Sequence, residues 1–203
     1  MNPRSWSSPL GGEEAVIKIL GISGSGREGS YNTALLTIAK ELLPEGAELE
    51  TCDVSRLPLF NEDLESDMPA SVKEFKRMVR EADAILFAVA EYNYSISAVM
   101  KNAIEWGNRP DNAWEGKPAA MMSASSSPRG GARAQLHLRQ ILVDLNMYPL
   151  NRPQILIANA QEKFNDHLQL TDERTRRLLR DLLYALAAWT RKLQGDHVLA
   201  QEH

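Results

Sequence analysis

The chain has 203 residues, of which 43% are hydrophobic and 25% charged, and these proportions fit one ordinary globular domain. Its formal net charge of −4 argues against a nucleic-acid partner or a membrane surface. No apolar stretch approaches the roughly 20 residues of a membrane span. Cys52 is the single cysteine, which excludes an internal disulfide and a multi-cysteine metal site, so we expect a reduced, cytoplasmic compartment and no metal.

Short apolar runs alternate along the chain with longer segments of helical periodicity. Strands are expected at residues 16–22, 48–53, 84–90, 118–123 and near 148–157, and helices at residues 32–43, 70–82, 98–106, 132–145 and 172–193. This alternation predicts an α/β fold with a parallel sheet and helices on both faces. In such a sheet the loops that follow the strands meet at one rim, where ligands bind.

The two ends of the chain differ in composition from this repeating pattern. Residues 1–14 are rich in Ser, Pro and Gly and lack the apolar core of a signal peptide, which predicts a flexible N-terminal leader. Residues 15–194 are expected to form a single domain, and residues 195–203 a flexible C-terminal tail. Residues 55–69 form a long loop whose apolar side chains we expect to pack on the domain or on another subunit.

The loop between the first strand and the first helix is rich in glycine and in hydrogen-bonding side chains. Glycines let backbone amides turn toward a ligand, and the start of a helix favours negative charge. The side chains that can donate to an anion are Ser23, Ser25, Arg27, Ser30, Asn32 and Thr33. The sequence therefore predicts a phosphate site at this loop.

Two phosphate ligands compete for that loop. Gly24, Gly26 and Gly29 spell the G-x-G-x-x-G pattern of dinucleotide-binding proteins, and Asp53 lies near the distance expected for a ribose-binding acid. The alternative is a terminal phosphate monoester held by a ring of hydroxyls and amides. A pyrophosphate needs few side-chain donors because the backbone approaches it closely, so the many hydroxyls favour the monoester.

Two further loops follow the third and fourth strands. The first carries Glu91, Tyr92, Asn93 and Tyr94, a combination that suits a flat ligand with a polar edge, although the tyrosines could instead pack on the adjacent helix. The second runs from Ser123 to Arg133 and could bring backbone donors to a ring, or form a plain solvated turn. Three such loops on one rim together predict a ligand site.

These motifs resemble the NADPH-dependent FMN reductase family, and within it the branch of chromate and quinone reductases and azoreductases. The resemblance covers roughly residues 17–193 and rests on the first loop, on residues 91–95, 101–106, 130–133 and 137–142. It implies a flavodoxin-like three-layer sandwich with a five-stranded parallel sheet in the order 2-1-3-4-5.

The resemblance also implies the site and the reaction. FMN would be bound, with its phosphate held by Ser23, Ser25, Arg27, Ser30, Asn32 and Thr33. Its ring would be lined by Glu91, Tyr92, Asn93 and Tyr94, and flanked by the third loop with Ser123, Ser125 and Gly130. FMN carries the chemistry, so no catalytic residue is expected: NADPH or NADH reduces it, and a quinone, azo compound, chromate, ferric chelate or free flavin oxidises it by a ping-pong scheme.

Some features depart from the family pattern or stay open. Ala90 stands where the family usually has a proline, and Ser97 and Ala98 stand where it usually has a proline and a glycine. We expect the loss of these residues to loosen or re-aim the second loop. Arg109 and Arg129 are candidates for binding the phosphates of the nicotinamide substrate, or are solvated rim charges.

The family forms homodimers or homotetramers, and residues 55–69 and 132–145 are candidate contacts. Three other functions share parts of this pattern: a flavodoxin-type electron carrier, a small NAD-dependent dehydrogenase using the glycine motif, and a flavin-binding redox sensor. Bound flavin colour and NAD(P)H oxidation separate them.

Overall fold

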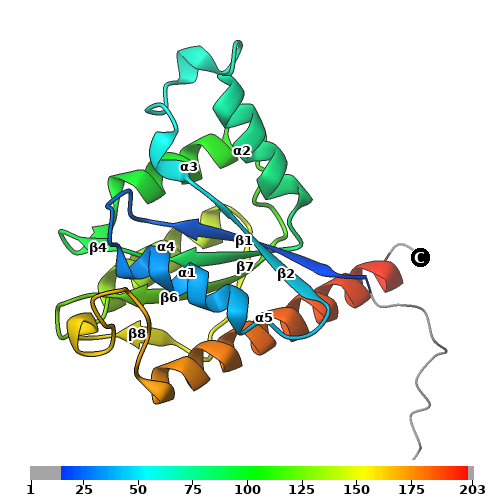
Figure 1. The fold of residues 1–203 in the computed structure, drawn as a ribbon. Coiled ribbons are helices and arrows are strands. Elements are labelled where there is room, and N and C mark those ends of the chain that lie inside the picture. The colour runs from blue at the N-terminus through cyan, green and yellow to red at the C-terminus, as the bar shows by residue number, and fades with distance from the viewer. Residues whose placement is uncertain (1–14, 201–203) are drawn as a thin grey trace, which may run out of the picture.

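The computed structural model describes residues 15–200 and has three layers (Figure 1). The central sheet contains β1 (Ile17–Ser23), β2 (Ala47–Cys52), β3 (Ala84–Ala88), β6 (Pro118–Ala124), β7 (Tyr148–Pro149) and β8 (Ile155–Ile157). Its order is β2-β1-β3-β6-β7, with β8 also on β6, and every pair is parallel. The predicted fold class and strand order are confirmed, with β6 as the fourth strand.

The fifth strand differs from the prediction because it is broken in two. A single strand was expected near residues 148–157, but β7 pairs with the start of β6 and β8 with its end. Pro149 ends β7 and Pro153 lies between the two pieces. Proline has no N–H to donate to a ladder, so a continuous strand cannot form across this segment.

Helices cover both faces of the sheet, and each face has its own core. On one face lie α1 (Tyr31–Glu41) and α5 (Glu173–Ala200), and on the other α2 (Ala70–Glu81), α3 (Ala98–Asn108) and α4 (Ala132–Asp144) (Figure 1). All five residues of β3 are buried: Leu86 faces the first core, and Ile85 and Phe87 face the second. A central parallel strand is covered on both sides, which explains its continuous apolar sequence.

The last helix is longer than expected. Its sequence pattern indicated an end at residue 193, whereas α5 continues to Ala200 and includes six residues of the expected tail. The expected leader, residues 1–14, and residues 201–203 lie outside the described part of the chain. Among the described residues no helix is both long and apolar enough to cross a membrane.

The segment before α2 projects from the domain and contains two short 3-10 turns, η1 (Val54–Arg56) and η2 (Glu62–Leu64) (Figure 1). Two residues of α3 hold it in place. The Asn102 side chain accepts from the N–H of Phe60 at 2.8 Å and donates to the carbonyl of Pro58 at 2.9 Å, and Trp106 Nε1 donates to the same carbonyl at 2.7 Å. Phe60 packs on the core, whereas Leu59 is 83% exposed.

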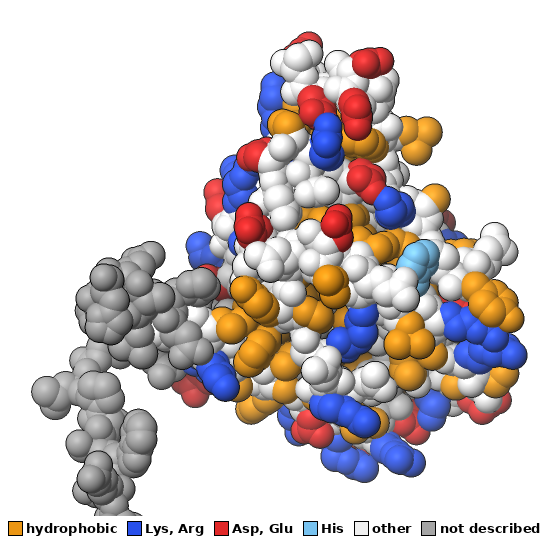
Figure 2. All heavy atoms as spheres, turned by 180° about the vertical axis from the view of Figure 1, so that it is seen from behind, with side chains coloured by type: hydrophobic (Ala, Val, Ile, Leu, Met, Phe, Trp, Pro, Cys, Tyr) orange, Lys and Arg blue, Asp and Glu red, His pale blue; other side chains and the backbone are white. Residues whose placement is uncertain are grey.

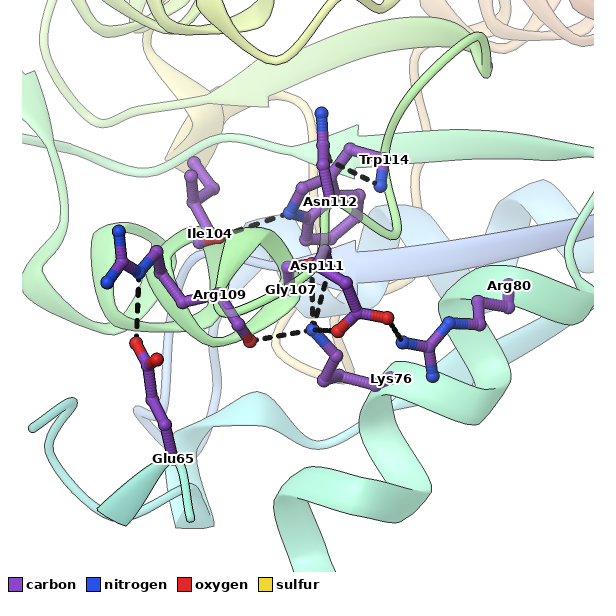
Figure 3. Close-up of polar contacts among 9 residues, drawn as sticks. All are labelled: Glu65, Lys76, Arg80, Ile104, Gly107, Arg109, Asp111, Asn112 and Trp114. Atoms are coloured by element: carbon purple, nitrogen blue, oxygen red, sulfur yellow. Dashed lines mark hydrogen bonds and ion pairs between the residues drawn. The ribbon is translucent and has the colours of Figure 1, made fainter. Parts of the chain in front are cut away.

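A buried lysine fixes the loop that follows α3 (Figure 3). Lys76 of α2 is only 2% exposed, and its ammonium donates to the carbonyls of Arg109 at 2.7 Å and Asp111 at 2.8 Å. It also pairs with the Asp111 carboxylate at 3.0 Å, which Arg80 contacts from the next turn of α2. Burial lowers the pKa of Lys76 and Asp111 opposes that shift. The end of α3 is thereby tied to α2.

Candidate functional site

The first loop leads from β1 into α1, and its side chains organise the turn. Ser30 is the N-cap of α1, and its hydroxyl accepts from the N–H of Thr33 at 3.3 Å. The hydroxyls of Ser23 and Thr33 are 2.8 Å apart, and Ser23 Oγ accepts from the N–H of Ser25 at 3.3 Å. Arg27 is exposed, and its guanidinium donates to the carbonyl of Gly29 at 3.4 Å. The N-terminal amides of α1 and this exposed cation suit an anion.

Asn32 joins the first loop to the end of β6. Its side-chain amide donates to the carbonyl of Ala124 at 3.0 Å and accepts from the N–H of Ala124 at 2.9 Å. The side chain is buried, so both of its polar atoms are used within the protein. The Asn32 side chain therefore fixes the position of α1, and its backbone N–H lies in the first turn of that helix, where an anion would be favoured.

Two glycines of the G-x-G-x-x-G pattern, Gly24 and Gly26, are required by close packing. A Cβ on Gly24 would lie 3.1 Å from the backbone N of Ala90, and one on Gly26 would lie 2.7 Å from Ser55 Cβ. Asp53 accepts from the N–H and the hydroxyl of Ser55, at 3.1 and 2.6 Å, which helps to lower its pKa. Asp53, the carboxylate that would bind a ribose under the dinucleotide interpretation, thus caps the 3-10 turn that follows it, η1.

The second loop, which we expect Ala90, Ser97 and Ala98 to loosen or re-aim, forms a β-hairpin in the structure. Its strands are β4 (Glu91–Tyr92) and β5 (Ser95–Ile96), and the two turn residues, Asn93 and Tyr94, have φ of 48° and 69°. Paired left-handed residues match the right-handed twist of a hairpin. Ser97 then caps α3, because its hydroxyl accepts from the N–H of Met100 at 3.1 Å.

Glu91 and Tyr94 attach this hairpin to α4. The Glu91 carboxylate accepts from the N–H groups of Arg133 and Ala134, at 3.0 and 3.2 Å, in the first turn of α4. The Arg133 guanidinium lies over the Tyr94 ring, 3.6 Å from its centroid. A third link joins Ser95 Oγ to His137 Nδ1 at 2.7 Å, so His137 has a structural contact. The hairpin and α4 therefore form one unit.

The third loop turns on two glycines above a buried serine. Gly130 and Gly131 have φ of 60° and 83°, where side chains are strained, and a Cβ on Gly131 would lie 2.7 Å from Ser123 Cβ. Ser123 is fully buried; its hydroxyl donates to the carbonyl of Gly130 at 2.5 Å and accepts from Gln135 Nε2 at 2.8 Å. The buried Ser123 thus holds the loop through the carbonyl of Gly130, whereas Ser125 is partly exposed.

The structure brings the three loops together around one hollow of about 480 Å³. The predicted site residues that line it are Ser25, Arg27, Ser30, Asn32, Glu91, Tyr92 and Ser125. A neighbouring hollow of about 590 Å³ shares Ser25, Arg27 and Tyr92 and adds Asn93 and the start of α3. Tyr92 is 53% exposed and borders both. Together they offer an anion cradle that leads into a partly apolar groove.

The other predicted residues lie around or beneath this cradle. Ser23 and Thr33 border a separate hollow of about 160 Å³ on the β2 side of the loop. Tyr94 is 69% exposed on the hairpin, and Arg129 is exposed on the third loop. Arg109 differs from Arg129, because its guanidinium donates to Glu65 at 2.9 Å and lies 3.5 Å from Glu62 (Figure 3). Arg109 is thus paired with the projecting segment.

Residues besides those assigned individually to FMN also shape the site, and Gln135 is the one among them that lies outside the segments named from the sequence as parts of this site. Ala90, Ala124 and Ser126 line the main hollow, and Gln135 supports the third loop from inside α4. Gly29 has φ of 69° and open space where a Cβ would stand. Nothing local in the sequence indicates that Gln135 reaches Ser123.

Known proteins share this arrangement across nearly the whole chain. Residues 17–162 match the NADPH-dependent FMN reductase family. An NAD(P)H-dependent FMN reductase of Pseudomonas aeruginosa is 49% identical over 88% of this chain and 98% of its own. An NAD(P)H:quinone oxidoreductase of Solanum tuberosum is 46% identical over 90% of this chain and 97% of its own.

A solved structure gives the same result. The flavoenzyme NAD(P)H:(acceptor) oxidoreductase from Paracoccus denitrificans superposes with a TM-score of 0.81 and 32% identity, covering 87% of this chain and 98% of that one. The family match and the two relatives identify one family, and this neighbour shares the fold. The chain belongs to the NADPH-dependent FMN reductase family and has its flavodoxin-like fold.

Proposed function

We propose that this protein is an FMN-containing NAD(P)H-dependent quinone reductase. The observation that carries the proposal is the hollow lined by all three sequence-predicted loops, at the rim of a flavodoxin-like sheet. Relatives 46% and 43% identical are named NAD(P)H:quinone and NADPH:quinone oxidoreductase, and they favour a quinone as the acceptor. Azo compounds, chromate, ferric chelates and free flavin are further candidate acceptors.

The residues present fit FMN. Ser25, Arg27, Ser30 and the first amides of α1 would hold the phosphate, in a loop whose Gly29 leaves open space. Glu91 to Tyr94 and Ser125 would line the ring. Ser23, Asn32, Thr33, Ser123 and Gly130 would act by holding the loops, through the hydrogen bonds described above.

When bound, FMN supplies two-electron transfer between NAD(P)H and the acceptor, so the protein needs no nucleophile. The chain contributes binding, orientation and shielding from water. Asn32 and Glu91 fix the first and second loops to β6 and α4, so that the cradle is formed before a ligand arrives. Arg129, which is exposed at the third loop, is a candidate for attracting the phosphates of NAD(P)H.

We further propose that the protein self-associates as a homodimer or homotetramer in the cytoplasm. The helix α4 presents Leu136 and Val143 at 61% and 76% exposure, and the projecting segment presents Leu59. Figure 2 shows the back of the molecule, where hydrophobic side chains gather in patches between charged ones. Such exposed apolar side chains are typical of protein interfaces.

The visible spectrum of the purified protein tests the proposed function. A flavin gives absorbance near about 450 nm, which should bleach with anaerobic NADPH and return when benzoquinone is added. A yellow protein that NADPH and NADH fail to bleach would indicate an electron carrier instead. A colourless protein that also fails to take up added FMN would refute the proposal.

A further inference from the structure

A second hollow, of about 670 Å³, lies behind the first loop. It is enclosed by α1 on one side and by residues 167–170 on the other, and Arg176 of α5 and Glu41 border it. Its size is in the range of small-molecule sites. The FMN cradle described above does not account for it, because most of its lining comes from α1 and from the segment before α5.

The outer wall of this hollow is a built loop. Phe164 and Leu170 form an isolated antiparallel bridge, and the Asn165 side chain accepts from the N–H groups of His167 and Gln169, both at 3.0 Å. The Phe164 ring lies 5.0 Å from that of Tyr31, so the loop packs against the start of α1 (Figure 1). The hollow therefore exists before a ligand binds.

The lining suits a flat, neutral heteroaromatic group. Ala34, Ile38, Leu168 and Leu170 give apolar walls, and Thr33, Thr37 and Gln169 offer polar atoms at the edge. The charge inside is balanced, because Arg176 is paired with Glu41 at 2.9 Å. Arg27 and Glu28 both lie at the mouth and are exposed, and the Arg27 guanidinium donates to the carbonyl of Gly29 at 3.4 Å. An uncharged base inside the hollow, with its phosphates outside, matches this distribution.

The two hollows meet at the crest of the first loop. Arg27, Gly29 and Ser30 line both of them, and the open space at Gly29 leaves the backbone there accessible. A ligand that reacts at the flavin ring and carries an adenosine at its other end could therefore extend across this crest. We propose that the hollow behind the first loop binds the adenosine half of NAD(P)H. The inference rests on the proposed function.

Filling the hollow tests this inference. Thr37 is exposed on α1, so Thr37→Trp leaves the core untouched and occupies the space. The KM for NADPH should rise about tenfold or more. Reduced nicotinamide mononucleotide, which lacks adenosine, should keep its KM, and the FMN content should not change. Thr37 also borders the smaller hollow near Cys52. Lys40 borders that smaller hollow but not the larger one, so Lys40→Trp is the control.

A binding measurement adds a readout that does not depend on turnover. Adenosine diphosphate ribose should bind the FMN-loaded protein in calorimetry, and both Thr37→Trp and Gln169→Trp, from opposite walls, should abolish that binding. If both variants keep the NADPH kinetics and the adenosine diphosphate ribose binding of the unmodified protein, the inference is overturned, even if the substitutions alter subunit association. If the unmodified protein does not oxidise NAD(P)H, the proposed function is refuted instead. The two failures are therefore distinguishable.

Discussion

Replacing Lys76 by methionine should destabilise the fold, because the buried ammonium binds a cluster of acceptors that then lose their donor (Figure 3). Methionine has a similar length and fits an apolar environment. It cannot donate to the carbonyls of Arg109 and Asp111, which Lys76 reaches at 2.7 and 2.8 Å, or to that of Gly107 at 3.4 Å. The Asp111 carboxylate also loses its partner at 3.0 Å.

The size of the effect follows from two opposing contributions. Removing one partner of a buried ion pair costs about 3–5 kcal/mol. The Asp111 side chain is 64% exposed, so water replaces part of its lost interaction and the cost falls below that range. Methionine also avoids the cost of burying a charge. We therefore expect a loss of about 2–4 kcal/mol in the free energy of unfolding.

Urea unfolding and thermal melting measure this loss. At about 2–4 °C per kcal/mol for a chain of this size, the melting temperature should fall by about 5–15 °C. Lys73→Met, at an exposed position on the same helix, is the matched control and should change stability by less than about 0.5 kcal/mol. A Lys76→Met protein as stable as this control would refute the assignment of a stabilising role to the buried ammonium.

Three further outcomes are expected. Gly131→Ala should cost about 2 kcal/mol or more in urea unfolding, because φ is 83° and the new Cβ would meet Ser123; Gly195→Ala, where space is open, is the control. Cys52 should react with iodoacetamide at pH 8 about 100-fold more slowly than a free cysteine, since burial, with help from nearby carboxylates, raises its pKa to about 11. Hydrogen bonds from Thr175 lower the pKa of Asp172. The carboxylate therefore stabilises the folded state above about pH 4, and this stabilisation is lost as the pH falls through the lowered pKa. Asp172→Asn should flatten that part of the acid unfolding curve.

The main elements could be predicted because their patterns are local. The apolar run of β3 and the helical periods lie between clear turn residues, and the expected ends fall close to the observed ones. The broken fifth strand and the longer α5 could not be placed as well. Pro149 and Pro153 interrupt the fifth strand, but the pairing of both pieces with β6 depends on the whole sheet.

The sequence also predicted that the three loops meet at one site, but not which of their side chains face the hollow and which hold the loops in place. Loops that follow parallel strands must meet at one rim, which placed Ser25, Arg27 and Tyr92 around one hollow. Whether a polar side chain faces that hollow or the protein depends on distant neighbours. Asn32 meets Ala124 across 92 positions of sequence, and a serine at position 123 gives no sign that Gln135 will bind it.

The motif of α3 shows the same limit. Asn102 and Trp106 belong to the segment that resembles the family. Both hold the projecting segment through the backbone of residues 58–60. Their partners lie more than 40 positions earlier, in a loop without regular periodicity. A motif can therefore identify a family while its residues support the site from a distance.

The hairpin of the second loop is held by a cap on α3 and by contacts with α4. Ser97 caps α3 by a side-chain hydrogen bond, which replaces the restriction that a proline would give at the start of a helix. Glu91 anchors one side of the hairpin to α4, and Arg133 stacks on Tyr94 at its turn. Because these contacts span the hairpin from its first strand to its turn, its position follows that of α4. A change in α4 should therefore re-aim the ring end of the cradle more strongly than restoring a proline at position 90 or 97.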